Sequence, residues 1–385
     1  MCEGRPKGRP FLFLCSMTVG DLCGWLEQRA PLRFQEDYDN SGLLVGQRSW
    51  TVTGVLCCLD ADEAVVHEAV ARGCNVVLSH HPIVFKGLKR LTGATAVERT
   101  VALALKHNVA LYAGHTNWDS IQGGVSFSLA QRLGLVAPRI MMPRGGELLN
   151  LVVYVPAEHA SSVAEAAFGA GAGRIGAYDE CHFSGSGTGT FRPLDGAQPF
   201  VGQIGVREVA DEHRLEFVLP KHRKSAVQQA VWAAHPYEEV AHSWISLDNS
   251  WSEVGYGAVG NLPEPIRLGD FLAVCAAQLG AESVRYSTSS LDRIVQRIAV
   301  CGGSGAEFAG AAAAAGADVY VTGDLKYHGF QDPPGGLVLV DVGHGESERP
   351  FIDDWAELIR SEFVTFAVLI SETDNRPVRT YQHHG

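Results

Sequence analysis

Short apolar runs that end in polar residues alternate along this chain with longer segments of helical spacing. The apolar run 76–78 is too short for a helix and ends at Ser79, so it predicts a buried strand. Further strands are predicted at 52–60, 109–113, 293–301, 318–321 and 337–342, and helices at 18–30, 61–73, 95–107, 266–280, 306–316 and 344–360. This alternation is typical of an α/β fold with helical layers and a largely parallel sheet.

The pattern changes between residues 147 and 250. A strand at 149–156, a helix at 157–169 and a glycine-rich loop at 171–178 precede short strands around 181–183 and 202–208, a strand at 214–219, a helix at 222–234 and a last strand that opens at His235. This order predicts a compact α+β domain, inserted between a first half at 17–146 and a second half at 251–385. The proline-containing segment 262–265 predicts a stiff junction.

Composition narrows the class of protein. The 385 residues are 46% hydrophobic and 19% charged, which indicates a folded chain, and the net charge of -12 argues against a general nucleic-acid binder. Nine cysteines without a C-x-x-C pair predict reduced core residues in a cytoplasmic protein. No segment reaches the ~20 apolar residues of a membrane span. The basic and apolar residues 1–16 are too short for a signal peptide and are expected to be disordered or an extension before a start at Met17.

Polar clusters follow several predicted strands at the ends where α/β sheets bind ligands. His80 and His81 follow the 76–79 strand, and His115, Thr116 and Asp119 follow the 109–113 strand. Taken alone, the two histidines would be core residues, and Asp119 is about equally a bridging metal ligand or the cap of a helix at 124–133. His115 and Thr116 are interpreted as supports of ligands rather than ligands.

Two further clusters lie in the second half. Asp324 and His328 follow the 318–321 strand, and His344 and Glu348 begin the last predicted helix. The i, i+4 spacing places His344 and Glu348 on one helix face. Glu346 and Glu348 could instead complement the helix dipole. Together the strand ends supply a mixed imidazole and carboxylate set that suits two divalent ions of zinc, manganese, iron, cobalt or nickel, about 3.5 to 4 Å apart and sharing a water or hydroxide.

The segments LSHHPIVFKGL, GHTNWDS, TGDLKYHGF and VGHGESE resemble the Nif-three-like dinuclear metal-centre family, whose members carry the name GTP cyclohydrolase I type 2 homologue in many genomes. The resemblance implies a three-layer core of two similar α/β halves, an inserted module related to PII and CutA, and a homohexamer. It also implies two metal ions held by five ligands, with Asp119 and Glu348 as bridges: His80, His81, Asp119, His344 and Glu348.

The expected function is therefore a metal-dependent hydrolase for a nucleotide or another phosphorylated small molecule. Lys86, Lys326 and the glycine loop 302–305 are candidate anion contacts, while His115, Asp324 and His328 are candidate proton relays or supports. The alternative is a metal-binding scaffold or metal chaperone whose inserted domain is regulatory. A ring threaded by DNA is disfavoured by the negative charge. His235 with Glu238 and Glu239 could also bind a metal, but a structural role is preferred.

Overall fold

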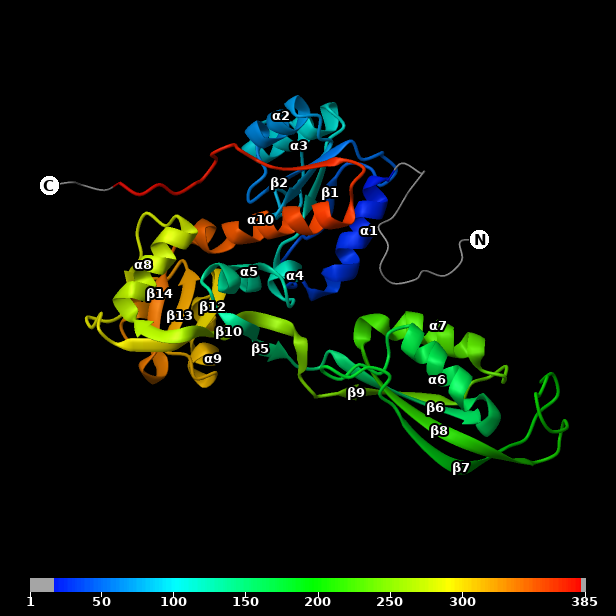
Figure 1. The fold of residues 1–385 in the computed structure, drawn as a ribbon. Coiled ribbons are helices and arrows are strands. Elements are labelled where there is room, and N and C mark those ends of the chain that lie inside the picture. The colour runs from blue at the N-terminus through cyan, green and yellow to red at the C-terminus, as the bar shows by residue number, and fades with distance from the viewer. Residues whose placement is uncertain (1–16, 382–385) are drawn as a thin grey trace. The chain divides into compact units, whose positions relative to one another are not determined.

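The computed structural model describes residues 17–381, so the predictions for residues 1–16 lie outside the described part. The chain divides into two compact units, one formed by Met1–Met142 with Glu253–Gly385 and the other by Pro143–Ser252 (Figure 1). Among the described residues, no helix combines the length and the apolar character needed to cross a bilayer.

The first sheet of the larger unit has the strand order β1-β4-β3-β2-β15. Its strands are β1 (Gly42–Val45), β2 (Gly54–Cys58), β3 (Val76–Ser79), β4 (Ala110–Ala113) and β15 (Ala367–Ile370), and the last four are parallel. Helix α1 (Val19–Arg29) is capped by Thr18, whose side chain accepts the Asp21 N–H. Helices α2 (Glu63–Ala71) and α3 (Ala96–Lys106) connect the central strands.

The second sheet has the order β11-β14-β13-β12-β10-β5. Strands β12 (Ile294–Ser304), β13 (Val319–Gly323) and β14 (Val338–Asp341) are parallel. Strand β10 (Trp251–Arg267) runs antiparallel to β12, and β11 (Arg285–Tyr286) runs antiparallel to β14, while β5 (Val136–Arg144) lies at the edge. The sheet is therefore mixed. The predicted junction at 262–265 was wrong, because these residues belong to β10, at an interruption of register between Asn261 and Ile266 that accommodates the prolines.

Helices join the two sheets of the larger unit. Helix α10 (His344–Glu362) packs against β12 and β13 of one sheet, β2 and β15 of the other, and α5 (Val125–Arg132). Its buried face includes Phe351, Trp355 and Ile359. Helices α8 (Leu268–Leu279) and α9 (Ala309–Ala314) accompany the second sheet, and α4 (Thr116–Asp119) is a single turn after β4. The long amphipathic helix thus fixes the strand ends of both sheets around its first turn.

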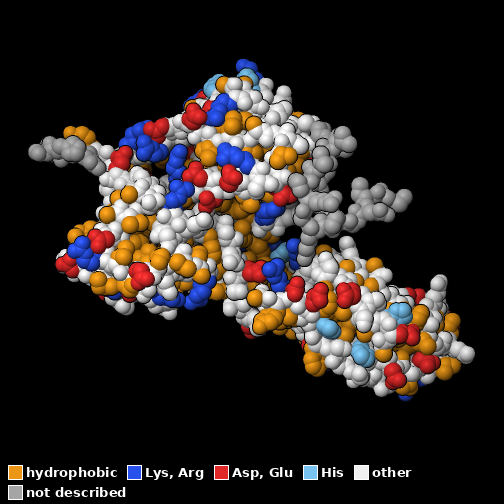
Figure 2. Space-filling model, viewed as in Figure 1, with side chains coloured by type: hydrophobic (Ala, Val, Ile, Leu, Met, Phe, Trp, Pro, Cys, Tyr) orange, Lys and Arg blue, Asp and Glu red, His pale blue; other side chains and the backbone are white. Residues whose placement is uncertain are grey.

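The smaller unit has a β-α-β-β-α-β order. It consists of β6 (Leu148–Pro156), α6 (Ala160–Gly169), β7 (Phe183–Phe191), β8 (Glu208–Pro220), α7 (Lys224–Ala234) and β9 (His242–Leu247), with the antiparallel order β7-β8-β6-β9 of a ferredoxin-like fold. The predicted strand at His235 was wrong, since β9 begins at His242. His235 is buried, and its ring bonds the Tyr154 carbonyl and the Tyr237 N–H, which supports the structural role. Acidic, basic and hydrophobic side chains are intermixed on the visible surface of both units (Figure 2).

Candidate metal centre

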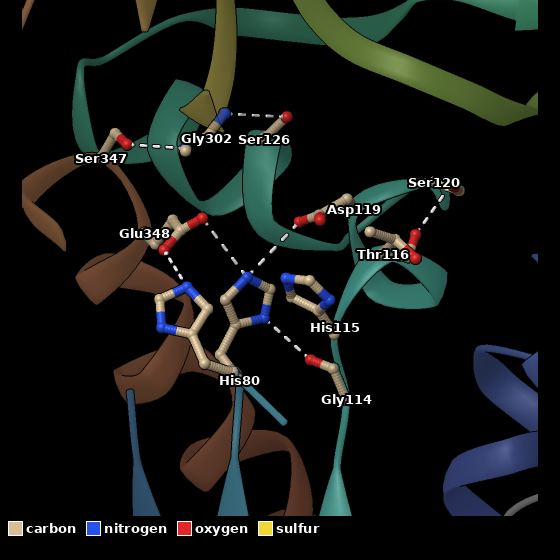
Figure 3. A network of polar contacts seen from close by, with 12 residues as sticks. His80, Gly114, His115, Thr116, Asp119, Ser120, Ser126, Gly302, Ser347 and Glu348 are labelled. Carbon is tan, nitrogen blue, oxygen red and sulfur yellow. Dashed lines mark hydrogen bonds and ion pairs between the residues drawn. The ribbon is translucent and has the colours of Figure 1, made fainter. Parts of the chain in front are cut away.

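Three strand ends of the larger unit deliver four histidines to one place. His80 and His81 follow β3, where their N–H groups donate to the carbonyls of Cys58 (3.2 Å) and Leu59 (3.0 Å) at the end of β2. His115 follows the parallel strand β4, and His344 is the first residue of α10 after β14. Figure 3 shows the His80 ring pointing up from the strand end between the carboxylates of Glu348 and Asp119.

Each of the four imidazoles is held by its Nδ1 atom. The Nδ1–H group of His80 donates to the Gly114 carbonyl (2.8 Å), and that of His81 donates to the Asp60 carboxylate (2.8 Å). In the same way, His115 donates to Asp39 (2.7 Å) and His344 donates to Asp324 (2.8 Å). Because these oxygens accept the Nδ1 proton, Nε2 of each ring is the atom left for the centre. Metal-binding histidines are oriented in this way in proteins.

Glu348 lies at the middle of the cluster, one helical turn after His344. Its side chain is only 4% exposed; Oε1 lies 3.4 Å from His80 Nε2, and Oε2 lies 3.0 Å from His81 Nε2 and 3.3 Å from His344 Nε2. Burial acts to raise the pKa of Glu348, but the surrounding imidazoles outweigh it and hold the pKa well below its usual range. The carboxylate is therefore ionised and directs its two oxygens to different histidines.

The donor atoms form two overlapping groups. Within the described residues, the sets of three or more metal-binding atoms that lie within 4.8 Å of one another are His80, His81 and His115, and His81, His344 and Glu348. The Nε2 atoms of His81 and His344 are only 3.3 Å apart. A proton on one of the two atoms allows a hydrogen bond at this distance, whereas two unprotonated atoms would direct lone pairs at each other and two protonated ones would repel. A cation between or beside them removes either conflict.

Protonation of the metal-free centre reflects the same carboxylates. Burial lowers the pKa of His81, but Asp60 and Glu348 outweigh it and raise the pKa to about 10. Glu348 is also the main cause that raises the pKa of His344 to about 9. Protons thus occupy positions that cations would take, so metal binding at neutral pH must release them.

Asp119 lies on the other side of His80, with its Oδ1 atom 3.8 Å from His80 Nε2. It does not cap α5, whose N-terminal cap is Gly124, so that alternative was wrong. Burial is the main cause that raises the pKa of Asp119 to about 7. Among the described residues, the buried atoms His80 Nε2, Asp119 Oδ1 and Glu348 Oε2 find no hydrogen-bond partner of suitable geometry. Divalent cations would satisfy all three, so the residues present fit a metal centre.

The remaining predicted residues differ in their position. Asp324, at a left-handed φ of 56°, orients His344, and His115 directs its free nitrogen at His80 and His81, so both belong to the centre. His328 is exposed and bonds Gln331. The side chains of Lys86 and Lys326 are exposed.

The glycine segment 302–305 at the end of β12 does not offer the predicted anion cradle. The N–H groups of Gly302, Gly303 and Gly305 donate to the hydroxyls of Ser126 (3.3 Å), Ser347 (2.9 Å) and Thr322 (3.0 Å). Its glycines serve the metal centre instead, since a Cβ atom on Gly303 would lie 2.3 Å from Glu348 Oε1. The loop leaves the space that Glu348 occupies.

Sequence reasoning missed Asp39 and Asp60, which hold His115 and His81. The Asp39 carboxylate also accepts the Thr116 N–H (3.1 Å) and the Ser41 hydroxyl (3.0 Å), and its side chain is fully buried. A signal existed for Asp60, because it follows β2 at the same sheet edge as His80. Asp39 lies in a turn-rich loop before β1, and only the fold brings it to the end of β4.

Comparison with known proteins places these residues among related chains. Residues 17–377 match the family model Duf34/NIF3 (NGG1p interacting factor 3). Two similar proteins, from Bacillus subtilis (strain 168) and Mycobacterium leprae (strain TN), are both named GTP cyclohydrolase 1 type 2 homolog. They are 37% and 38% identical over 91% of this chain, and over 95% and 92% of their own lengths. A crystal structure of a Bacillus cereus protein related to NIF3 is similar with a TM-score of 0.83 and 35% identity, and covers 94% of this chain and 99% of its own.

Proposed function

Because the chain belongs to the Duf34/NIF3 family, we propose that its centre binds two divalent metal ions and that the protein hydrolyses a nucleotide or a related phosphorylated small molecule. The observation that carries this proposal is that the two carboxylate oxygens of Glu348 face different histidines: Oε1 faces His80, and Oε2 faces His81 and His344. A carboxylate placed in this way can bridge two ions and offset their repulsion.

Each residue has a defined part in this proposal. His80, His115 and Asp119 would hold one ion, and His81 and His344 the other, with Glu348 between them. Asp39, Asp60, Asp324 and the Gly114 carbonyl keep the four Nε2 atoms directed inward. The bound ions would act as Lewis acids that make water a nucleophile at neutral pH. His115, predicted as a proton relay, is assigned to the ligand set by its place beside His80 and His81.

The relatives' names suggest GTP as one substrate to test, with opening of the imidazole ring by water as the reaction. Zinc, manganese, iron, cobalt and nickel each suit the donor set of imidazole and carboxylate. The experiment is turnover of a nucleotide panel that includes GTP by the protein reconstituted with each metal. His80→Ala should lose turnover. His107→Ala, which replaces an exposed histidine at the end of α3, should keep it.

One observation favours the second candidate, a metal-binding scaffold or metal chaperone with a regulatory smaller unit. Four imidazole nitrogens and the four oxygens of Asp119 and Glu348 are enough to fill two tetrahedral ions, which would leave no place for water. The absorption spectrum of the cobalt-substituted protein distinguishes the two. A change on addition of azide supports an open, hydrolytic site, and an unchanged spectrum supports the scaffold.

We also propose that the protein is a cytoplasmic homo-oligomer, with the hexamer as the expected state. Support comes from the family resemblance and from the seven described cysteines, all of which are free and six of which are buried. Sedimentation equilibrium of the full chain tests the assembly, since a monomer of 41.3 kDa and its hexamer differ six-fold in mass.

A further inference from the structure

Two exposed aromatic side chains lie beside the metal centre. Tyr38 is 67% exposed and Phe85 is 43% exposed, and their ring centroids are 6.3 Å apart. The Phe85 ring is in turn 6.3 Å from the ring of His115 in an edge-on arrangement. These rings form a short apolar path from solvent to the ligand cluster. Aromatic side chains next to a few polar groups are a common lining of ligand-binding sites.

Both rings are carried by backbone that is held in place. Tyr38 precedes Asp39, whose fully buried carboxylate is bonded to His115, Thr116 and Ser41. The Asn40 side chain donates to the Val84 carbonyl (2.6 Å), so the loop of Tyr38 is tied to the loop of Phe85. The aromatic surface is therefore preorganised, which lowers the entropy lost when a ligand binds.

The loop that carries Phe85 is also basic. Lys86, Lys89 and Arg90 are exposed, and within the described part of the chain none of them forms an ion pair or a hydrogen bond. Three unpaired cations within five residues give this loop a local positive charge in a chain of net charge -12. Lys86 follows Phe85, whose ring is 6.3 Å from the ring of His115, so an anion bound by this loop would lie on the same side as the metal centre.

We propose that Tyr38, Phe85 and the cations of the 86–90 loop form a recognition surface for a planar heteroaromatic base that carries a phosphate chain, which is the chemistry of a nucleotide. The base stacks on the aromatic rings, and Lys86, Lys89 and Arg90 neutralise the phosphates. This inference rests on the proposed function in one respect: it takes the metal centre to be the place where the substrate reacts.

The test measures binding to the zinc-loaded full-length protein by calorimetry, with 7-deaza-GTP and inorganic triphosphate as probes. The 7-deaza base keeps the planar ring but lacks the N7 atom needed for ring opening. Tyr38→Ala and Phe85→Ala should each weaken the binding of 7-deaza-GTP by about ten-fold and leave the affinity for triphosphate unchanged. Tyr38→Phe and Phe85→Tyr should bind like the wild type. Tyr381→Ala, which removes another exposed ring, is the matched control.

Replacing Lys86, Lys89 and Arg90 together by Gln should weaken the binding of both probes by about ten-fold or more. It should also make the affinity depend less on the salt concentration. Lys106→Gln, an exposed cation on α3, should have no effect. Zinc content is measured for every variant, since the inference requires it to stay at the wild-type level.

The outcomes separate this inference from the proposed function. Binding in the expected pattern without turnover of GTP would support the recognition surface and contradict the hydrolase. Turnover of GTP that persists in Tyr38→Ala, Phe85→Ala and the triple variant would contradict the recognition surface alone. Absence of 7-deaza-GTP binding by the wild type would also overturn the inference.

Discussion

Replacement of Gly303 by alanine should damage the metal centre far more than the fold. Gly303 has a φ of +66°, and a Cβ atom there would lie 2.3 Å from Glu348 Oε1 and 3.4 Å from His344 Nε2. Ordinary contact needs about 3.4 Å, so the carboxylate oxygen must move by about 1 Å or the backbone must shift. Because Oε1 is the atom that faces His80, this movement would separate the carboxylate from the ion proposed at His80.

The cost to stability can be separated from the cost to metal binding with Gly280→Ala. Gly280 has a φ of +63° at the end of α8, and a Cβ atom there would meet no other atom within 4 Å. Gly280→Ala therefore has the same cost of a left-handed backbone as Gly303→Ala, but no steric clash. Gly280→Ala should lose about 1–2 kcal/mol of unfolding free energy in the metal-free state, and Gly303→Ala should lose at least as much, because it also displaces Glu348. Gly303→Ala should in addition bind zinc about 10- to 100-fold more weakly.

Urea unfolding in EDTA measures the first quantity, and competition with a chromophoric chelator measures the second. Equal zinc affinity of Gly303→Ala and Gly280→Ala would refute the reasoning, because it would show that the position of Glu348 does not determine binding.

Three further predictions concern the protons and supports of the centre. Asp324→Asn should weaken zinc binding by about 10- to 100-fold, measured by chelator competition, because the amide holds His344 less strongly than the carboxylate. His81 has a raised pKa in the folded state, so its stabilisation is complete below pH 6.5 and is lost as the pH rises toward 10. From pH 6.5 to 8.5 the His81 contribution should fall by up to about 3 kcal/mol, and His344, whose pKa is raised to about 9, adds a loss in the same direction. Urea unfolding of the metal-free protein should therefore show falling stability over this range, and a flat profile would contradict the assignment. The raised pKa of Asp119 means that its ionised form destabilises the metal-free fold above pH 7, although part of its side chain is exposed. Asp119→Asn should therefore raise the unfolding free energy of the metal-free protein at pH 8, by up to about 4 kcal/mol. The same variant should hold less zinc.

Much of the larger unit could be predicted because its strands are short, buried and followed by polar residues. The strand at β3 and the helix of α10 correspond to strong local patterns, and parallel pairing then brings strand ends together. The length of β10 could not be predicted in this way. Pro263 and Pro265 normally exclude a strand, and they are tolerated only where the pairing with β12 is interrupted.

The metal centre shows a similar division. His80, His81, His344 and Glu348 were found from strand ends and helical spacing, and the structure brings their donor atoms together. Asp39 was missed because its role depends on contact with His115 across 76 positions of the chain. The interpretation of the 302–305 loop failed because local glycine spacing cannot reveal that hydroxyls of α5, β13 and α10 already accept its N–H groups.

The measurement that tests the central claim most directly is the metal content per chain of the purified protein, determined by elemental analysis after reconstitution and removal of free metal. The wild type and His107→Ala should hold two ions, while His80→Ala should hold fewer, because Nε2 of His80 faces both Asp119 and Glu348. Fewer than one ion in the wild type, or two ions in His80→Ala, would contradict the account.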